Sequence, residues 1–119
     1  MEIKLYDSEL KIMEILWKNG DMTAKKIAEI TNESIGWSKT TTYTVIKKCI
    51  DKGAAERIEP GFVCHALVSK EEAQQYETQE LINKMYDGSA DQLVASILGN
   101  KKLNSQEIER LKKLVSDLK

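Results

Sequence analysis

The chain has 119 residues, 41% hydrophobic and 31% charged, which suits one compact domain or a small domain with an appendage. Its net charge is -1, which excludes a protein coated in positive charge, but residues 37–69 alone hold more basic (5) than acidic (3) side chains. No apolar run is long enough for a bilayer span or a secretory signal, so we expect a cytoplasmic protein with no membrane partner.

The sequence contains no recognisable arrangement for catalysis or metal binding. Its two cysteines, Cys49 and Cys64, form neither a disulfide framework nor a metal cluster, and its one histidine, His65, has no ligand at a suitable spacing. A Gly-rich phosphate loop and a nucleophile elbow are also missing. We therefore expect no cofactor, no metal and no enzymatic activity. A small hydrolase would have to rely on carboxylates alone, and no pair of them stands out.

Two helices are predicted near the N-terminus. The first spans residues 8–18 with Ser8 as its N-cap, and the second spans residues 24–31 with Thr23 as its N-cap. Residues 32–36 are predicted to form the turn that follows. A third helix comes next, so the arrangement predicts a helix-turn-helix.

The third helix has both ends marked, by Ser38 as N-cap and by Gly53 at its C-terminus. One face has the spacing of a buried stripe and consists of Thr42, Val45, Ile46, Cys49 and Ile50. The opposite face is rich in threonine and lysine and contains no acid: Thr40, Thr41, Thr44, Lys47 and Lys48, with Tyr43 on its flank. Threonine methyls and hydroxyls can contact base edges, and lysine neutralises phosphate. This face predicts a DNA-reading helix; the alternative is a surface helix with a chance cluster of threonines.

An extended pattern follows the third helix. Residues 54–58 and 62–68 predict two strands, joined by a turn at Glu59-Pro60-Gly61. A helix-turn-helix followed by a β-hairpin is a winged helix, so the fold class is mainly α with a small β-hairpin wing.

Three more helices are predicted after the wing, over residues 70–87, 90–98 and 106–118, with Ser69 and Ser105 as N-caps of the first and last.

These last helices carry more apolar surface than so few residues can enclose in a monomer. We therefore expect a homodimer, with a winged-helix DNA-binding domain at 1–69 and a helical dimerisation domain at 70–119. The alternative is packing of the helices back onto the winged domain. The expected dimerisation residues are Tyr86, Leu93, Val94, Ile97, Leu98, Ile108, Leu111, Leu114, Val115 and Leu118.

Several short motifs occur together in one known family. They are Trp37-Ser38, Thr41-Thr42-Tyr43-Thr44-Val45-Ile46-Lys47-Lys48, Lys52-Gly53, Leu67-Val68-Ser69-Lys70-Glu71-Glu72-Ala73 and Tyr86-Asp87-Gly88-Ser89. Through them the chain resembles the penicillinase repressor family, the BlaI, MecI and CopY type of regulators, over essentially its whole length. The resemblance implies a homodimeric repressor that binds operators with inverted TACA/TGTA-type half-sites through its third helix. Thr44 and Lys48 then match DNA-facing positions of that helix, and Thr41 matches its opening threonine.

The chain departs from the family pattern in three places. Members inactivated by a sensor protease are cut at an Asn-Phe bond, where this chain has Ser96-Ile97, so we expect cleavage at that bond to be lost or altered. The paired C-terminal cysteines of the copper-responsive branch have no counterpart, so copper sensing is not expected. The wing tip lacks the basic residue common in such wings, which leaves Arg57 for phosphate. The expected DNA-binding residues are Ser38, Lys39, Thr40, Thr41, Tyr43, Thr44, Lys47, Lys48 and Arg57.

A second function fits part of the sequence. The sequence pI of about 5.9 and the acidic wing tip would suit a winged helix that works as a protein–protein interaction module without binding DNA. The threonines and lysines of the third helix favour double-stranded operator DNA as the partner.

Overall fold

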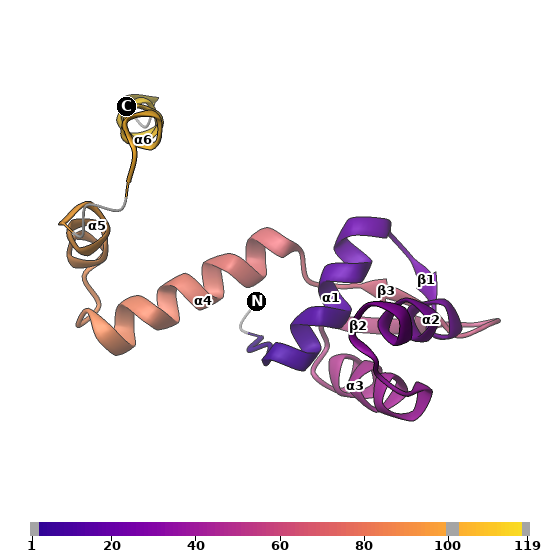
Figure 1. Cartoon of the computed structure of the whole chain (residues 1–119). Coiled ribbons are helices and arrows are strands. Elements are labelled where there is room, and N and C mark those ends of the chain that lie inside the picture. The colour runs from indigo at the N-terminus through magenta and orange to yellow at the C-terminus, as the bar shows by residue number, and fades with distance from the viewer. Residues whose placement is uncertain (1–2, 100–102, 118–119) are drawn as a thin grey trace. The chain divides into compact units, whose positions relative to one another are not determined.

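A computed structural model describes residues 3–99 and 103–117. The chain is mainly helical with one small antiparallel sheet (Figure 1). Its elements, in chain order, are α1 (Asp7–Asn19), β1 (Met22–Thr23), α2 (Ala24–Ile35), α3 (Lys39–Asp51), β2 (Ala55–Ile58), β3 (Val63–Ala66), α4 (Lys70–Met85), α5 (Ala90–Gly99) and α6 (Ser105–Asp117). None of the helices in the described ranges is long and apolar enough to cross a bilayer. The mainly α fold with a hairpin wing is thus as predicted.

The chain divides into two compact units, Met1–Glu77 and Thr78–Lys119. The first unit extends beyond residue 69, where the sequence predicted the domain boundary. The physical reason is that the first turns of α4 belong to the winged domain: Ala73 is buried in its core, and Lys4 forms an ion pair with Glu77 at 3.3 Å.

The core of the first unit lies where α1, α2 and α3 meet the sheet (Figure 1). Its fully buried side chains include Ile12, Met13, Ile27, Ile46, Cys49 and Cys64. The predicted stripe of α3 is confirmed, because Thr42, Val45, Ile46 and Cys49 are buried and Ile50 is half-buried. Burial of this stripe leaves the threonine- and lysine-rich face of α3 on the outside.

The two helices of the helix-turn-helix begin as predicted. The hydroxyl of Thr23 accepts the N–H of Lys26 at 3.1 Å, and that of Ser38 accepts the N–H of Thr41 at 3.1 Å. α2, however, continues to Ile35 instead of ending near residue 31. The helix ends at Gly36, whose φ of 72° is the left-handed conformation that glycine adopts without steric cost.

The predicted caps of the first and last helices were wrong by a small shift. α1 already includes Ser8, and the carboxylate of Glu9 instead accepts the N–H of Tyr6 at 2.9 Å. α6 already includes Ser105, and its first turn is capped by Asn104, whose side-chain oxygen accepts the N–H of Glu107 at 2.8 Å. In each case several polar residues stand together, and the residue that starts the helix is decided by which one reaches an unpaired N–H.

The sheet has three strands in the order β1-β3-β2, one more than predicted. β2 and β3 form the predicted hairpin, with Arg57 opposite Cys64, and the turn of residues 59–62 contains a cis Glu59–Pro60 bond. The extra strand, β1, pairs with β3 through only two residues. Two residues carry no periodicity, so the sequence pattern held no signal for it. We call β2, β3 and their turn the wing.

Candidate nucleic-acid interface

The outward face of α3 presents the residues that the sequence predicted for DNA binding. Seven of them are exposed, namely Ser38, Lys39, Thr40, Thr41, Thr44, Lys47 and Lys48, and Tyr43 is half-buried. Lys39, Thr40, Tyr43, Thr44 and Lys47 line a shallow hollow of about 420 Å³. The folded chain therefore gathers these side chains on one accessible surface.

Internal hydrogen bonds decide what the threonines of this face can offer a ligand. The hydroxyl of Thr44 donates to the carbonyl of Thr40 at 2.9 Å, so outward it presents a methyl group and an acceptor lone pair. The hydroxyl of Thr41 accepts from that of Ser38 at 3.0 Å and keeps its own proton for donation. Thr44 thus suits a thymine methyl or a base amino group, and Thr41 suits an acceptor such as a phosphate oxygen.

The lysines of this face differ in their surroundings. Lys47 forms an ion pair with Asp51 at 3.0 Å, and the ammonium of Lys39 lies 5.6 Å from the centroid of the Tyr43 ring. Lys48 has no ion-pair partner among the residues that the structure describes. Exposed ion pairs are weak, about 0–1 kcal/mol, so Lys47 can exchange Asp51 for a phosphate at small cost. Lys48 needs no such exchange.

The start of α3 is fixed against α2 by two buried hydroxyls. Thr31 and Thr42 are both fully buried, and their oxygens lie 2.7 Å apart. Thr31 also contacts the carbonyl of Ala28 at 3.2 Å, and Thr42 that of Ser38 at 3.0 Å. The two hydroxyls have one proton each but make three hydrogen-bond contacts, so one of the protons must be shared between two acceptors. The hydroxyls are satisfied only while the two helices keep this crossing.

The end of α3 is held by a partly buried ion pair that sequence reasoning missed. The ammonium of Lys52 binds the carboxylate of Glu9 on α1, the carbonyl of Lys4 at 2.7 Å and the face of the Tyr6 ring at 4.4 Å. Burial acts to raise the pKa of Glu9, but hydrogen bonds from Lys52 and the Tyr6 N–H outweigh it and hold that pKa below its ordinary value. The only sequence signal was an acid beside the apolar positions of α1.

The wing holds Arg57 in a different state from the one predicted for a phosphate contact. Its Nε and Nη2 donate to one carboxylate oxygen of Glu59, at 2.9 Å and 2.8 Å. Its Cζ lies 3.7 Å from the centroid of the Phe62 ring, which in turn meets the Tyr43 ring edge-on, with centroids 5.7 Å apart. Arg57 is therefore exposed but already paired, and Phe62 links it to α3.

The predicted dimerisation residues lie in the second unit and mostly face solvent in the single chain. Val94, Ile97, Leu98, Ile108, Leu111, Leu114 and Val115 are exposed, with Val115 the most so at 63%. Tyr86 and Leu93 are half-buried, and the hydroxyl of Tyr86 donates to that of Ser96 at 3.2 Å. Leu118 lies outside the described residues. Within the described part of the chain, none of the side chains of α5 is fully buried.

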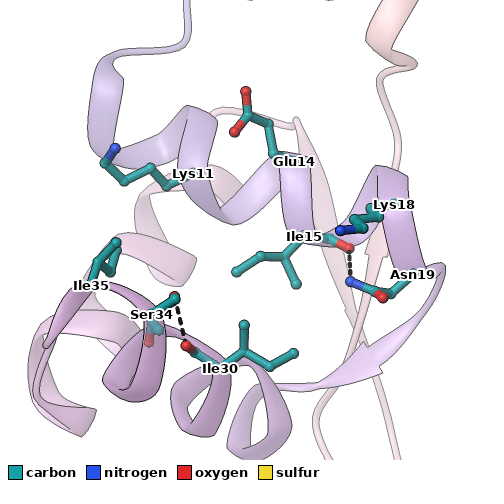
Figure 2. Close-up of a pocket in the computed structure, with 9 residues that line it drawn as sticks. Lys11, Glu14, Ile15, Lys18, Asn19, Ile30, Ser34 and Ile35 are labelled. Carbon is teal, nitrogen blue, oxygen red and sulfur yellow. Dashed lines mark hydrogen bonds between the residues drawn. The ribbon is translucent and has the colours of Figure 1, made fainter.

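A groove of about 480 Å³ lies elsewhere in the first unit, between α1 and α2 (Figure 2). Ile15 and Ile30 point toward each other across it, and Lys11, Glu14 and Lys18 stand on the α1 side. It shares no residue with the outward face of α3. Its apolar walls and mixed charges provide no reactive group.

The remaining candidates for chemistry are inert or isolated. Burial raises the pKa of Cys49 to about 12 and that of Cys64 to about 11, which keeps both thiols protonated and unreactive. The Nδ1 of His65 lies 2.7 Å from a carboxylate oxygen of Asp21, whose hydrogen bond and charge raise the pKa of the imidazole. Within the described ranges, no three histidine, cysteine or acidic side chains come together as metal ligands.

Three helices, a three-stranded sheet with a hairpin, and an exposed second helix of the helix-turn-helix define a winged-helix protein. The chain belongs to the penicillinase repressor family, whose match spans residues 5–117.

Two relatives illustrate the family. The chain is 24% identical over 118 residues to the penicillinase repressor of Bacillus licheniformis, covering 98% of this chain and 92% of that protein. It is 27% identical over 121 residues to the methicillin resistance regulatory protein MecI of Mammaliicoccus sciuri, covering 98% of each.

Two solved structures share the fold. One is the solution structure of the DNA-binding domain of the repressor BlaI, with a TM-score of 0.55, 23% identity and coverage of 60% of this chain and 90% of that one. The other is the Bacillus licheniformis BlaI monomeric form in complex with the blaP half-operator, with a TM-score of 0.54 and the same identity and coverage.

Proposed function

We propose that this chain is a DNA-binding transcriptional repressor that acts as a homodimer on an inverted-repeat operator. The observation that carries the proposal is the outward face of α3, which is exposed, bears threonines and lysines, and is backed by a stripe of buried and half-buried side chains. A helix of this composition, presented by a helix-turn-helix, suits the major groove of double-stranded DNA. Membership of the penicillinase repressor family, and the half-operator bound by a relative of the same fold, support it.

Each residue of the face has a proposed role. Thr44, near the middle of α3, reads a base edge, while Lys48, Lys47 and Lys39 neutralise phosphates. Ser38 and Thr41, at the start of the helix, meet the DNA backbone, where the positive end of the helix dipole also favours an anion. Thr40 borders the reading position. Tyr43 sits on the flank, between the face and the wing residue Arg57.

The homodimer is proposed to form through the second unit. Seven exposed apolar side chains on α5 and α6 would be covered by a second copy of the chain, which removes apolar surface from water. Two linked heads also raise the effective concentration of the second DNA contact. We expect the full chain to sediment as a dimer and a chain ending at Glu77 as a monomer. A full-length monomer at micromolar concentration would contradict this part of the proposal.

A sensor protease remains a proposed partner rather than an assigned one. α5 presents Ser96 and Ile97 on its exposed surface, inside a helix. A protease that acted there would first have to unwind that helix. Release of the repressor from DNA would follow from loss of the apolar surface that α5 and α6 contribute to the dimer.

The decisive experiment measures binding to DNA directly. Full-length protein is titrated by fluorescence anisotropy against the region upstream of its own gene and against a scrambled duplex, each over a salt series. We expect tighter binding to the upstream region, with an affinity that falls steeply as salt rises. Lys48→Ala should weaken both, whereas the matched variant Lys11→Ala, on the groove between α1 and α2, should weaken neither.

The alternative function predicts a different pattern. If neither duplex is bound, or if Lys11→Ala and Lys48→Ala behave alike, the DNA-reading role of α3 fails. The acidic pairing of Arg57 on the wing would then favour the protein–protein interaction module.

A further inference from the structure

The wing has a single strong cation, and an acid of the same hairpin already occupies it. Arg57 is the only lysine or arginine between Lys52 and Lys70. Glu59 takes two of its N–H groups, and both side chains are about half exposed, at 49% and 55%. The wing therefore carries a solvent-exposed arginine whose charge is compensated by Glu59.

The pairing is built into the hairpin. The second carboxylate oxygen of Glu59 accepts the N–H of Phe62 at 2.8 Å, and this bond, together with Arg57, holds the pKa of Glu59 below its ordinary value. Phe62 has a φ of 53°, which is unusual for a bulky residue and persists only where its surroundings determine it. Here its N–H is bound by Glu59 and its ring lies between Arg57 and Tyr43.

The same contacts join the pair to the candidate DNA interface. Tyr43 belongs to α3, and its ring is the edge-on neighbour of Phe62. Only the Phe62 ring thus lies between Arg57 and Tyr43 of α3, and Arg57 stands on the flank where Lys39 and Tyr43 lie. A duplex held by α3 would bring its backbone close to this flank.

We infer that Glu59 is a specificity-determining residue: its carboxylate takes the position on Arg57 that a DNA phosphate would take, so the charge of Arg57 stays compensated until a phosphate replaces Glu59. The inference rests on the proposed function of α3. A guanidinium donates to carboxylate and phosphate oxygens alike, so the two anions compete for the same N–H groups of Arg57.

The competition lowers binding to random DNA. Non-specific binding comes almost entirely from phosphate neutralisation, and an arginine already paired with an acid of its own hairpin contributes less to it. On the operator, contacts between α3 and the bases hold one phosphate beside Arg57 for the lifetime of the complex, and this phosphate displaces Glu59. The wing thereby adds to affinity chiefly where α3 has already found its sequence.

Four full-length variants test the inference: Glu59→Gln, Arg57→Gln, the double variant, and Glu56→Gln as a matched control. Glutamine at 59 keeps an oxygen for the Phe62 N–H but loses the charge that holds Arg57. Glu56 directly precedes Arg57 on β2, so its side chain faces the other side of the sheet. Glu56→Gln therefore removes the same charge as Glu59→Gln without releasing Arg57. Each protein is titrated against a labelled random-sequence duplex and against the upstream region, over a salt series.

Glu59→Gln should bind the random duplex about 5- to 10-fold more tightly at 0.1 M salt, with a salt slope steeper by about 1, as expected for one new phosphate contact. Glu56→Gln should change the affinity by about 2-fold or less, because its charge acts only through screening solvent. On the random duplex, Arg57→Gln alone should also have a small effect, but in the Glu59→Gln background it should abolish the whole gain.

The inference is overturned if Glu59→Gln leaves affinity and slope unchanged, if Glu56→Gln matches it, or if the two wing changes are additive, since additivity means independent charges. If the wild-type protein still binds its upstream region in such a case, only the inference about Glu59 fails and the proposed function stands. If the wild type binds no duplex, both fail together. Circular dichroism of all four variants establishes that the comparison is between folded proteins.

Discussion

Replacing Lys52 by methionine should destabilise the protein more than any single substitution on the outward face of α3. The substitution keeps the apolar stem and removes the ammonium that serves Glu9, whose side chain is only 4% exposed. Removing one partner of a buried ion pair costs about 3–5 kcal/mol, because the other charge stays buried without compensation. Lys52 itself is 28% exposed, so water can reach the vacated site, and we expect the lower end, about 3 kcal/mol.

The partner change sharpens the prediction. Glu9→Gln removes the charge but keeps an oxygen for the Tyr6 N–H, and Lys52 keeps the Lys4 carbonyl, so we expect a loss of about 1–1.5 kcal/mol. The double variant should lose less than the sum of the two single variants, by about 1–2 kcal/mol, because the second change removes the uncompensated charge that the first leaves behind.

Urea unfolding, followed by circular dichroism and by tryptophan fluorescence, measures these free energies. All variants are compared at one protein concentration, since the proposed dimer would make apparent stability depend on concentration. Because the pKa of Glu9 is lowered in the folded state, its contribution is present above the ordinary carboxyl pKa and is lost as pH falls through the lowered value. Glu9→Gln should flatten that acid limb. A loss below about 1 kcal/mol for Lys52→Met, or strict additivity, would refute the reasoning.

The remaining predictions concern reading, titration and cleavage. Thr44→Val should keep operator affinity if the outward methyl makes the contact, whereas Thr44→Ala should cost about 1–3 kcal/mol on the operator and little on scrambled DNA. Lys48→Ala should instead weaken both equally and lower the salt slope by about 1; equal proportional losses from Thr44→Ala would remove its reading role. In an NMR titration the pKa of His65 should lie above its ordinary value, and Asp21→Asn should return it toward that value. Because the pKa is raised in the folded state, the stability that the His65–Asp21 pair adds is present at acid pH and is lost as pH rises through the raised pKa. Co-expression with a cognate sensor and mass spectrometry should find no fragment ending at Ser96, and such a fragment would show that Ser96-Ile97 can be cut.

Sequence reasoning succeeded where local chemistry decides the structure. Ser38 and Thr23 were each predicted as the N-cap of a following helix, and both act as such. The buried stripe of α3 follows from periodicity, and the position of its outward face follows from the stripe. Gly53 has the left-handed φ, 82°, that its place after a helix predicted. These features depend on residues that are close together in the sequence, so they can be predicted from the sequence alone.

The features that were missed depend on partners far away in the chain. Glu9 and Lys52 are separated by 43 residues, and nothing in the pattern around either one names the other. β1 has meaning only as a partner of β3. Arg57 and Glu59 are close in sequence, but their pairing depends on a turn that folds Phe62 back over the arginine. The sequence shows that each of these residues is charged, but the tertiary structure determines which partner it binds.

These distant contacts have a common consequence for α3. The helix is fixed near its start by the Thr31–Thr42 hydroxyls, at its end by Lys52, and on one flank by Tyr43 against Phe62. Three attachments spread along one helix restrain its translation and its rotation, so the outward face has little freedom left to lose on binding. Ordering a mobile side chain or loop at an interface costs about 0.5–1.5 kcal/mol for each immobilised side chain, and a restrained helix avoids most of that cost. A change at Thr42 or Lys52 should therefore weaken operator binding indirectly, by loosening the support of the residues that are proposed to contact DNA.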